Sequence, residues 1–282
     1  MLTFCAAGES VALPSALTDN ISVPLSGKVR LQLLPSTLNA MVANSGTITT
    51  NSGQVLMQAA AVSDAVASIT HTGTIDTTGA QGGAVTLQSD HGIIKATGKI
   101  KANSKNAKNK GGDIVIGRDE VTGVLAKSTD VSGSHLTTSN GFVETSGDHL
   151  ATDGVSIKAA QWLLDPSDIT ISNASTTDSN VSGGPSNIQP TSGAATSTVS
   201  VNTIQNAINA GTSVTIATTN TGGTSGSGAG AGNITIANAL VFNNQGLTDA
   251  TLSLIADNGI TQNTGATITT DLVNSTKLVN IS

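Results

Sequence analysis

Short alternating segments, in which two apolar residues flank one small or polar residue, recur along most of this chain. Successive side chains on a β-strand point to opposite faces, so each segment places a narrow apolar stripe on one face of a very short strand. One such strand cannot bury its stripe, whereas many strands stacked in register cover one another. The pairs that show the pattern are Val55/Met57, Val85/Leu87, Ile114/Ile116, Val155/Ile157, Ile169/Ile171, Val214/Ile216, Ile234/Ile236 and Leu252/Leu254. The pattern predicts an all-β solenoid rather than a globular core.

Glycine turns precede several of these strands at a nearly regular interval. Gly46, Gly73 and Gly98 each begin a Gly-x-Ile segment and are 27 and 25 residues apart, within the range of roughly 20 to 50 residues typical of structural repeats. The glycine pairs 82–83 and 111–112 precede a second strand of the repeat. We therefore expect coils of two or three strands separated by turns.

Composition favours the same fold. Aromatic residues make up 1% of the chain and charged residues 11%, whereas a wide globular core of this length normally uses more large aromatic side chains. A thin stacked core needs only Val, Ile, Leu and Ala. The net charge of −6 argues against nonspecific binding to nucleic acid, and no apolar run is long enough to span a membrane.

The chain divides into four predicted parts. The 202–211 segment begins with a capping residue, has apolar positions at helical spacing and ends in glycine, which predicts a short amphipathic helix. Residues 222–232 are almost entirely Gly, Ser and Ala, which predicts a flexible loop between two coils. We predict an irregular segment over 1–28, β-helix coils over 29–171, a low-complexity Ser/Thr/Asn-rich linker over 172–200, and a short helix followed by further solenoid coils over 201–282.

Three segments carry a resemblance to a known family. Residues 141–147 (GFVETSG), 154–159 (GVSIKA) and 162–166 (WLLDP) together resemble a phrase of filamentous-haemagglutinin-type exoproteins of Gram-negative bacteria. Residues 42–57 are similar to an earlier segment of the same proteins, and the resemblance extends over roughly 29–270. It implies a right-handed parallel β-helix, exported by two-partner secretion and used for adhesion or as a stalk.

The N-terminal residues depart from that family. Its members begin with a signal peptide and a secretion domain, and residues 1–10 show neither a basic region nor a long enough apolar stretch. We therefore expect an interior segment of a longer extracellular or cell-surface protein, or a truncated reading frame with Met1 as a secondary start. The outer-membrane transporter would be a partner of the full-length parent only. Because cut solenoids expose unpaired strand edges, we also expect end-to-end self-association.

Few residues suggest a chemical site. A basic run would meet anionic sugars if it were exposed, although a solvated loop is the commoner explanation; its members are Lys99, Lys101, Lys105, Lys108 and Lys110. The histidines show no metal-ligand spacing; they are His71, His91, His135 and His149. Cys5 is the single cysteine, so no internal disulfide can form. We predict neither metal nor cofactor, and the sequence leaves the ligand-binding residues unknown.

Three other patterns have ordinary explanations. Enzymatic β-helices place acidic and basic residues in one groove, and the candidates here are Asp113, Arg118, Asp119 and Glu120; surface turns commonly contain such residues, so we predict no catalytic residue and no enzyme. The pairs Thr47/Thr49, Thr267/Thr269 and Thr74/Asp76 resemble ice-binding solenoids, but threonine simply favours strands. Glycosylation sequons occur at Asn20, Asn173, Asn180, Asn233, Asn274 and Asn280, and chance explains most of them in this composition.

The function predicted from the sequence is structural support and attachment rather than catalysis. We expect a non-enzymatic segment of a secreted bacterial adhesin, a rigid β-helical rod that presents loops such as 99–110 and 222–232 to a host-cell glycan or protein receptor. The main alternative is an inert stalk of a contact-dependent toxin or of an iron-source-binding exoprotein. A polysaccharide-acting β-helix enzyme is the minor alternative.

Overall fold

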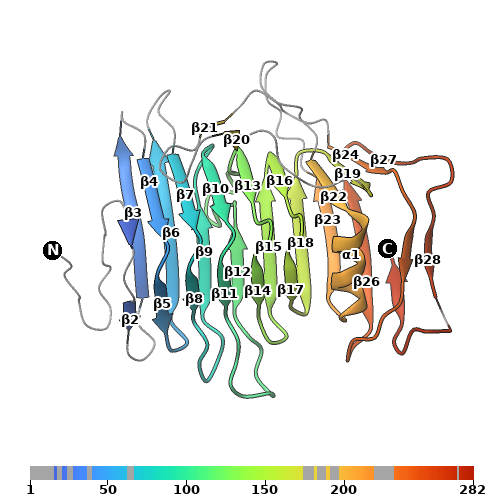
Figure 1. Cartoon of the computed structure of the whole chain (residues 1–282), viewed down its shortest axis with the longest axis horizontal. Helices are drawn as coiled ribbons and strands as arrows, with labels where there is room; N and C mark the ends of the chain where they lie inside the picture. The colour runs from blue at the N-terminus through green and yellow to red at the C-terminus, as the bar shows by residue number, and fades with distance from the viewer. Residues whose placement is uncertain are drawn as a thin grey trace.

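The computed structural model describes residues 41–60, 67–173, 197–218, 232–271 and 273–282 in full. It describes the backbone alone at Ala40, at Ala61 and in five strands, β1 (Ala16–Leu17), β2 (Ile21–Val23), β3 (Lys28–Ser36), β20 (Val181–Ser182) and β21 (Gln189–Pro190). The described chain is mostly β-structure, with short strands arranged side by side along the long axis of the molecule (Figure 1).

The remaining elements are short strands and one helix, α1 (Val201–Asn209). The strands are β4 (Ala40–Asn44), β5 (Thr47–Thr50), β6 (Gln54–Ala61), β7 (Ala67–His71), β8 (Thr74–Asp76), β9 (Ala84–Gln88), β10 (Ile93–Ala96), β11 (Lys99–Lys101), β12 (Asp113–Ile116), β13 (Ser128–Asp130), β14 (His135–Thr137), β15 (Phe142–Gly147), β16 (His149–Ala151), β17 (Ser156–Lys158), β18 (Gln161–Pro166), β19 (Ile169–Ser172), β22 (Ser197–Ser200), β23 (Ser213–Thr218), β24 (Asn233–Ile236), β25 (Leu240–Phe242), β26 (Ala250–Ala256), β27 (Gly259–Gln262), β28 (Ile268–Thr270) and β29 (Val279–Ile281).

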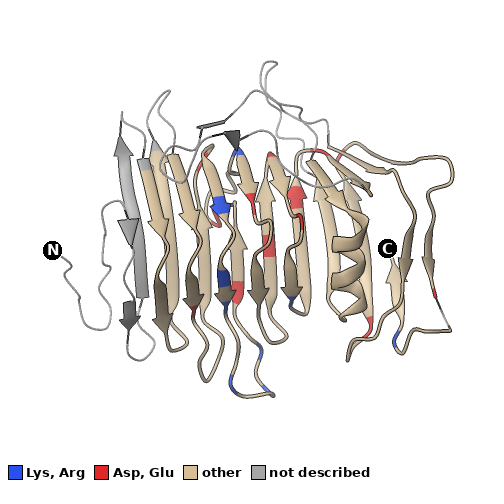
Figure 2. Ribbon diagram, in the orientation of Figure 1, with Lys and Arg blue, Asp and Glu red and all other residues tan. Residues whose placement is uncertain are grey.

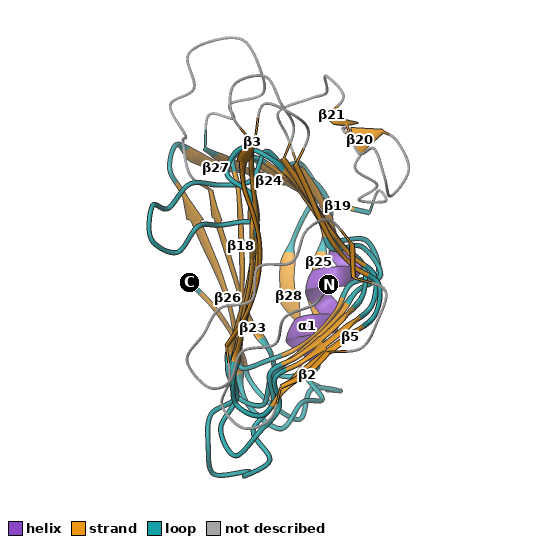
Figure 3. Ribbon diagram, turned by 90° about the vertical axis from the view of Figure 1, so that its left-hand side faces the viewer, coloured by secondary structure: helices purple, strands orange, loops and turns teal. Residues whose placement is uncertain are grey.

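Most strands form parallel sheets in which neighbours are usually three strands apart in the chain, and β20 and β21 form a separate antiparallel pair. The first sheet has the order β1-β4-β7-β10-β13-β16, the second β2-β5-β8-β11-β14-β17, and the third β3-β6-β9-β12-β15-β18-β23-β26-β29. Three successive strands therefore contribute one strand to each sheet, and we call such a set a rung. Figure 3, which looks along the stack, shows the sheets as separate walls around the interior. The prediction of an all-β chain is confirmed, and the pairing within these three sheets is parallel.

The core consists of columns of like side chains at the same position of successive rungs. In the second sheet Ile48, Ile75 and Ile100 lie opposite one another and are fully buried. The third sheet stacks Val55, Val85 and Ile114 in the same way. The apolar pairs predicted from the alternation are buried, except that Leu254 is half-buried. One detail of the prediction is wrong, because Val155 is buried in the turn before β17 rather than on a strand.

Strand order changes near the predicted linker. β19 lies between β22 and β24, and the order of this sheet is β22-β19-β24-β27. At its other edge β22 adjoins β16, where the Leu150 amide donates to Ser197 Oγ at 2.8 Å. A strand that comes later in the chain thus lies between β16 and β19. Residues 174–180, 183–188 and 191–196 of the linker lie outside the described residues.

The predicted helix is present as α1, and its capping residue differs from the prediction. Ser200, rather than Asn202, is the N-cap, and its hydroxyl accepts from the Asn202 amide at 3.2 Å. The buried face of α1 carries Val201, Ile204 and Ile208. The helix contacts β17 and β25 and lies in line with the wall that contains β5 (Figure 3). α1 therefore occupies a position in the stack that a strand fills in the earlier rungs. It is far shorter than a membrane-spanning helix, and the described residues contain no helix that is long and apolar enough to be one.

Candidate ligand-binding groove

The segment between β12 and β13 folds back on itself as a compact loop. Arg118 and Leu125 face each other as an antiparallel bridge. Inside this bridge the Asp119 amide donates to the Val124 carbonyl at 2.9 Å, and the Gly123 amide donates to the Asp119 carbonyl at 2.8 Å. We call residues 117–126 the groove loop. Its internal hydrogen bonds give it a defined shape of its own.

Two charged side chains attach the groove loop to the outer face of the third sheet. The buried Asp119 accepts at Oδ1 from the amide of Val121 at 2.7 Å, and at Oδ2 from Nε2 of Gln88 on β9 at 3.0 Å. The Arg118 guanidinium lies 3.5 Å from Oε1 of Glu144 on β15, which is 8% exposed. Because one partner of each pair is buried, water screens these contacts less than it screens surface ion pairs. The loop is thus held to two strands of the sheet.

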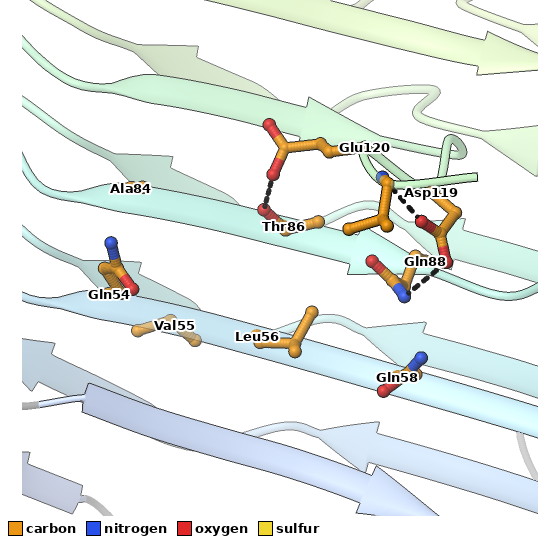
Figure 4. A pocket seen from close by; sticks show the side chains of 10 residues that line it. Gln54, Val55, Leu56, Gln58, Ala84, Thr86, Gln88, Asp119 and Glu120 are labelled. Atoms are coloured by element: carbon orange, nitrogen blue, oxygen red, sulfur yellow. Dashed lines mark hydrogen bonds between the residues drawn. The ribbon is translucent and has the colours of Figure 1, made fainter. Parts of the chain in front are cut away.

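A groove of about 380 Å³ lies between this loop and strands β6 and β9. Its floor is made of side chains that point outward because their neighbours on each strand point into the core. The register places Gln54 beside Ala84, Leu56 beside Thr86, and Gln58 beside Gln88. Asp119, Glu120 and Val121 of the groove loop complete the lining. Figure 4 shows Glu120 and Thr86 on one side of the groove and Gln54 and Gln58 on the other.

The lining is rich in groups that both donate and accept hydrogen bonds. Thr86 Oγ1 donates to Glu120 Oε2 at 3.4 Å, and Gln88 is engaged with Asp119. Within the described part of the chain, the side-chain amides of Gln54 and Gln58 have no hydrogen-bond partner, so each offers a carbonyl and an NH₂ group. Of the residues whose side chains the structure describes, no lysine or arginine lines the groove. The arrangement is suited to holding a polar ligand without forming a covalent bond to it.

The four residues of the predicted acidic and basic cluster lie in different places and have different partners. Asp119 and Glu120 line the groove, whereas Arg118 pairs with Glu144. Asp113 begins β12, at the other end of that strand from the loop, and lies 3.3 Å from the Lys110 ammonium. The four residues therefore form no single constellation. Among the residues that the structure describes, no group of three or more His, Cys, Asp or Glu side chains is placed to hold a metal ion.

The basic run lies away from this groove. Lys99 and Lys101 point outward from β11, in the second sheet, and Lys101 lies 3.9 Å from Asp76 on β8. Lys105 and Lys108 are exposed in the loop that follows, which extends beyond the stack after β11 (Figure 2). The run is exposed and partly neutralised by its neighbours. The other predicted presenting loop falls on residues 222–231, outside the described residues.

The histidines have four different surroundings. His71 is buried where the first sheet turns into the second: its Nδ1 accepts from Asn44 Nδ2 at 3.1 Å, and its Nε2 donates to the Lys99 carbonyl at 3.3 Å. Burial lowers the pKa of His71 to about 4, while hydrogen bonds to the backbone of Lys99 and of Asn44 act in the opposite direction. His135 is exposed on β14 and His149 is buried on β16, while His91 occupies an exposed turn with a φ of 54°.

A corner between the third and first sheets gathers several ionisable groups. Asp148 lies there, and its Oδ1 accepts from the buried Ser167 hydroxyl at 3.2 Å. Burial raises the pKa of the Asp148 carboxyl, while Ser167, His149, His91 and Lys127 act in the opposite direction. The contacts hold successive rungs together at this corner.

The threonine pairs do not form a regular array. Thr47 is followed in its column by Thr74 and then Lys99, while Thr49 is followed by Asp76 and Lys101. Of the sequons, Asn20 and Asn180 lie outside the described residues, Asn233 is half-buried, and Asn173, Asn274 and Asn280 are exposed.

Sequence reasoning missed the glutamines of the groove. The two strands concerned were predicted from the inward pairs Val55/Met57 and Val85/Leu87. The outward positions of the same strands carry Gln54, Gln58 and Gln88. The available signal was the repetition of one residue type at the ends of two alternating segments. This repetition does not indicate the position of the groove loop. The loop reaches Gln88 through Asp119, which lies 31 residues further along the chain.

Comparison with known proteins gives no match: no protein-family model, no curated protein and no solved structure is significantly similar to this chain. The groove is therefore assigned from its geometry alone.

Proposed function

We propose that this chain is a right-handed parallel β-helix and a non-enzymatic attachment segment of a filamentous-haemagglutinin-type bacterial surface exoprotein. The three-strand periodicity of the sheets supports the β-helix, because each rung contributes one strand to every sheet. The resemblance of residues 141–166 supports the family. The chain acts outside the cell as a stiff support on which loops meet a host-cell glycan or protein receptor.

The groove is the observation that carries the attachment function. An inert stalk needs only the columns of buried side chains, whereas here an inserted loop is fastened to β9 and β15 and encloses a polar groove. The groove keeps two glutamine amides unpaired and exposed to an incoming ligand. Asp119, with both carboxylate oxygens accepting hydrogen bonds, holds the loop in place, which supports binding rather than catalysis.

The test compares cell binding by the purified chain with that of a loop-shortened variant. Arg118 and Leu125 face each other, so residues 119–124 can be replaced by Asn-Gly, the preferred two-residue hairpin connection. We expect saturable binding to host cells that falls at least tenfold in this variant, with the far-ultraviolet circular dichroism unchanged. The control is replacement of Lys105 and Lys108 by serine, which leaves the groove intact.

The inert stalk remains the alternative, favoured by the regular stacking of the rungs. It predicts no saturable cell binding by either protein although both are folded. A polysaccharide-acting enzyme would instead generate unsaturated products from pectin, alginate or hyaluronan, detected by their ultraviolet absorbance.

A further inference from the structure

We propose that the groove between residues 117–126 and strands β6 and β9 binds an uncharged, hydroxyl-rich saccharide. This inference rests on the proposed attachment function and names the class of ligand that the groove would take. The argument depends on hydrogen-bonding capacity, charge and shape.

Hydrogen-bonding capacity matches a ligand with many hydroxyl groups. A sugar hydroxyl both donates and accepts, and an amide side chain offers both functions from one planar group. The free amides of Gln54 and Gln58 flank Leu56 on β6, and Glu120 adds a carboxylate that accepts from hydroxyl donors. Charge-assisted hydrogen bonds of this kind are about twice as strong as neutral ones. The groove thus supplies several hydrogen-bonding groups along one line.

The charge of the described lining disfavours anionic sugars. Among the residues that the structure describes, the lining contains the carboxylates of Asp119 and Glu120 and no lysine or arginine; in the register of the third sheet, Lys28 and Arg30 of β3 lie beside Gln54 and Leu56 of β6. Arg118, which precedes Asp119 in the chain, is paired with Glu144. A sulfate or sialate carboxylate bound here would lose its hydration and lie close to the like charges of Asp119 and Glu120, and both effects would weaken its binding. Asp119 already accepts hydrogen bonds at both carboxylate oxygens, so Glu120 is the carboxylate with more capacity left for a ligand.

Shape favours an oligosaccharide over a single sugar. Gln54 and Gln58 are four residues apart on one strand, about 13 Å at the usual rise per residue. Leu56 between them and Val121 on the groove loop, which is 94% exposed, provide apolar surface for the C–H faces of sugar rings. Because the loop is already anchored, binding would require little ordering of the backbone.

The experiment is a glycan array of neutral, sulfated and sialylated oligosaccharides, followed by titration calorimetry with the best neutral ligand. Gln54→Ala and Gln58→Ala are each expected to weaken binding roughly tenfold, the effect of losing one or two good hydrogen bonds. Gln161→Ala is the matched control, because Gln161 is exposed on β18 in the same outward column of the third sheet as Gln54. It should leave affinity unchanged.

Three results would overturn the inference: binding of sulfated or sialylated glycans only, binding of neutral glycans that both Gln54→Ala and Gln58→Ala retain at full strength, or binding of a cationic peptide in place of sugars. Cell attachment with no glycan binding would also overturn it while leaving the proposed attachment function intact. Conversely, glutamine-dependent binding of neutral glycans without cell attachment would support the inference and contradict the proposed function.

Discussion

His71 shows how a single buried side chain is specified by two hydrogen bonds of opposite direction. Nδ1 must accept from Asn44, and Nε2 must donate to the Lys99 carbonyl. The side-chain amide of Asn44 cannot be flipped without losing a second hydrogen bond, since its Oδ1 accepts from the Gly46 amide at 3.1 Å. One neutral tautomer satisfies this arrangement, and protonation would set two donors against each other. Burial lowers the pKa of His71 to about 4, and it outweighs the opposite effect of hydrogen bonds to the backbone of Lys99 and Asn44.

This side chain makes stability depend on pH. Between pH 6.5 and 4 His71 is largely protonated in the unfolded state and largely neutral in the folded state. The free energy of unfolding therefore falls as the pH falls through this window. We expect a loss of up to about 3 kcal/mol from His71 alone, measured by urea unfolding at pH 7.5, 5.5 and 4.

The control for this prediction is His71→Gln, whose amide still reaches toward the Lys99 carbonyl but does not titrate. Other groups contribute to the slope; the raised pKa of Asp148, for example, gives a contribution that is lost as the pH rises. The difference between the two proteins isolates His71. An identical pH dependence in both would contradict the argument.

Trp162 is the one tryptophan of the chain and is fully buried in the third sheet. Its Nε1 donates to Oγ1 of the buried Thr145 on the adjacent strand at 3.1 Å. Thr145→Val keeps the shape and leaves the indole N–H unpaired, which should cost about 1 to 3 kcal/mol. Urea unfolding, followed by tryptophan fluorescence, measures this loss in the free energy of unfolding. Thr215→Val, on the outward face of β23, should change stability by less than about 0.5 kcal/mol.

At the level of elements, glycines set how closely successive rungs approach. A Cβ added to Gly112 would lie 1.6 Å from the Gly83 carbonyl oxygen of the neighbouring rung. Gly112→Ala must therefore push two rungs apart, and we expect it to cost about 3 kcal/mol or more.

Gly133→Ala is the informative comparison for this prediction. Gly133 has a φ of 69° with nothing within 4 Å of an added Cβ, so its substitution costs only backbone strain, about 1 to 2 kcal/mol. Thermal unfolding of both variants measures the difference. Equal losses would show that backbone conformation, and not the distance between rungs, explains the glycine pairs.

The helix shows how one element can stand in for another. Beside β17, where earlier rungs have a further strand, Thr212 Oγ1 donates to the Ala159 carbonyl at 2.9 Å and accepts from the Ala159 amide at 3.4 Å. These bonds satisfy backbone groups next to β17 that a neighbouring strand would otherwise pair.

Over the whole molecule, burial depends on a covering rung. Ile234 is fully buried, whereas Ile260, its partner in the same column, is 49% exposed; Leu252 and Ile281 differ in the same way. We expect the purified chain to self-associate through this surface, which sedimentation velocity would detect as species larger than the monomer. Ile260→Thr with Ile281→Thr should shift the distribution toward the monomer.

Val121→Thr serves as the control for self-association, because Val121 is even more exposed than Ile260 and Ile281 but belongs to the groove loop. A monomer at all concentrations, or association that persists in the double variant, would contradict the prediction.

Local pattern was enough to predict several features. Alternation identified the inward residues of most strands, because a strand has one buried and one outward face whichever rung it joins. The helix at 201–209 followed from apolar spacing and a terminal glycine, although its cap was placed two residues too late. Resemblance, rather than pattern, led to the expected function.

What the sequence by itself determined is therefore the all-β class and the inward columns, since side-chain alternation and glycine turns are properties of neighbouring residues. Tertiary structure alone decided that β22 lies between β16 and β19, and that the groove loop rests on β6 and β9. Both depend on contacts between residues about 30 or more apart. Their energies arise only when rungs are stacked, so no local pattern records them.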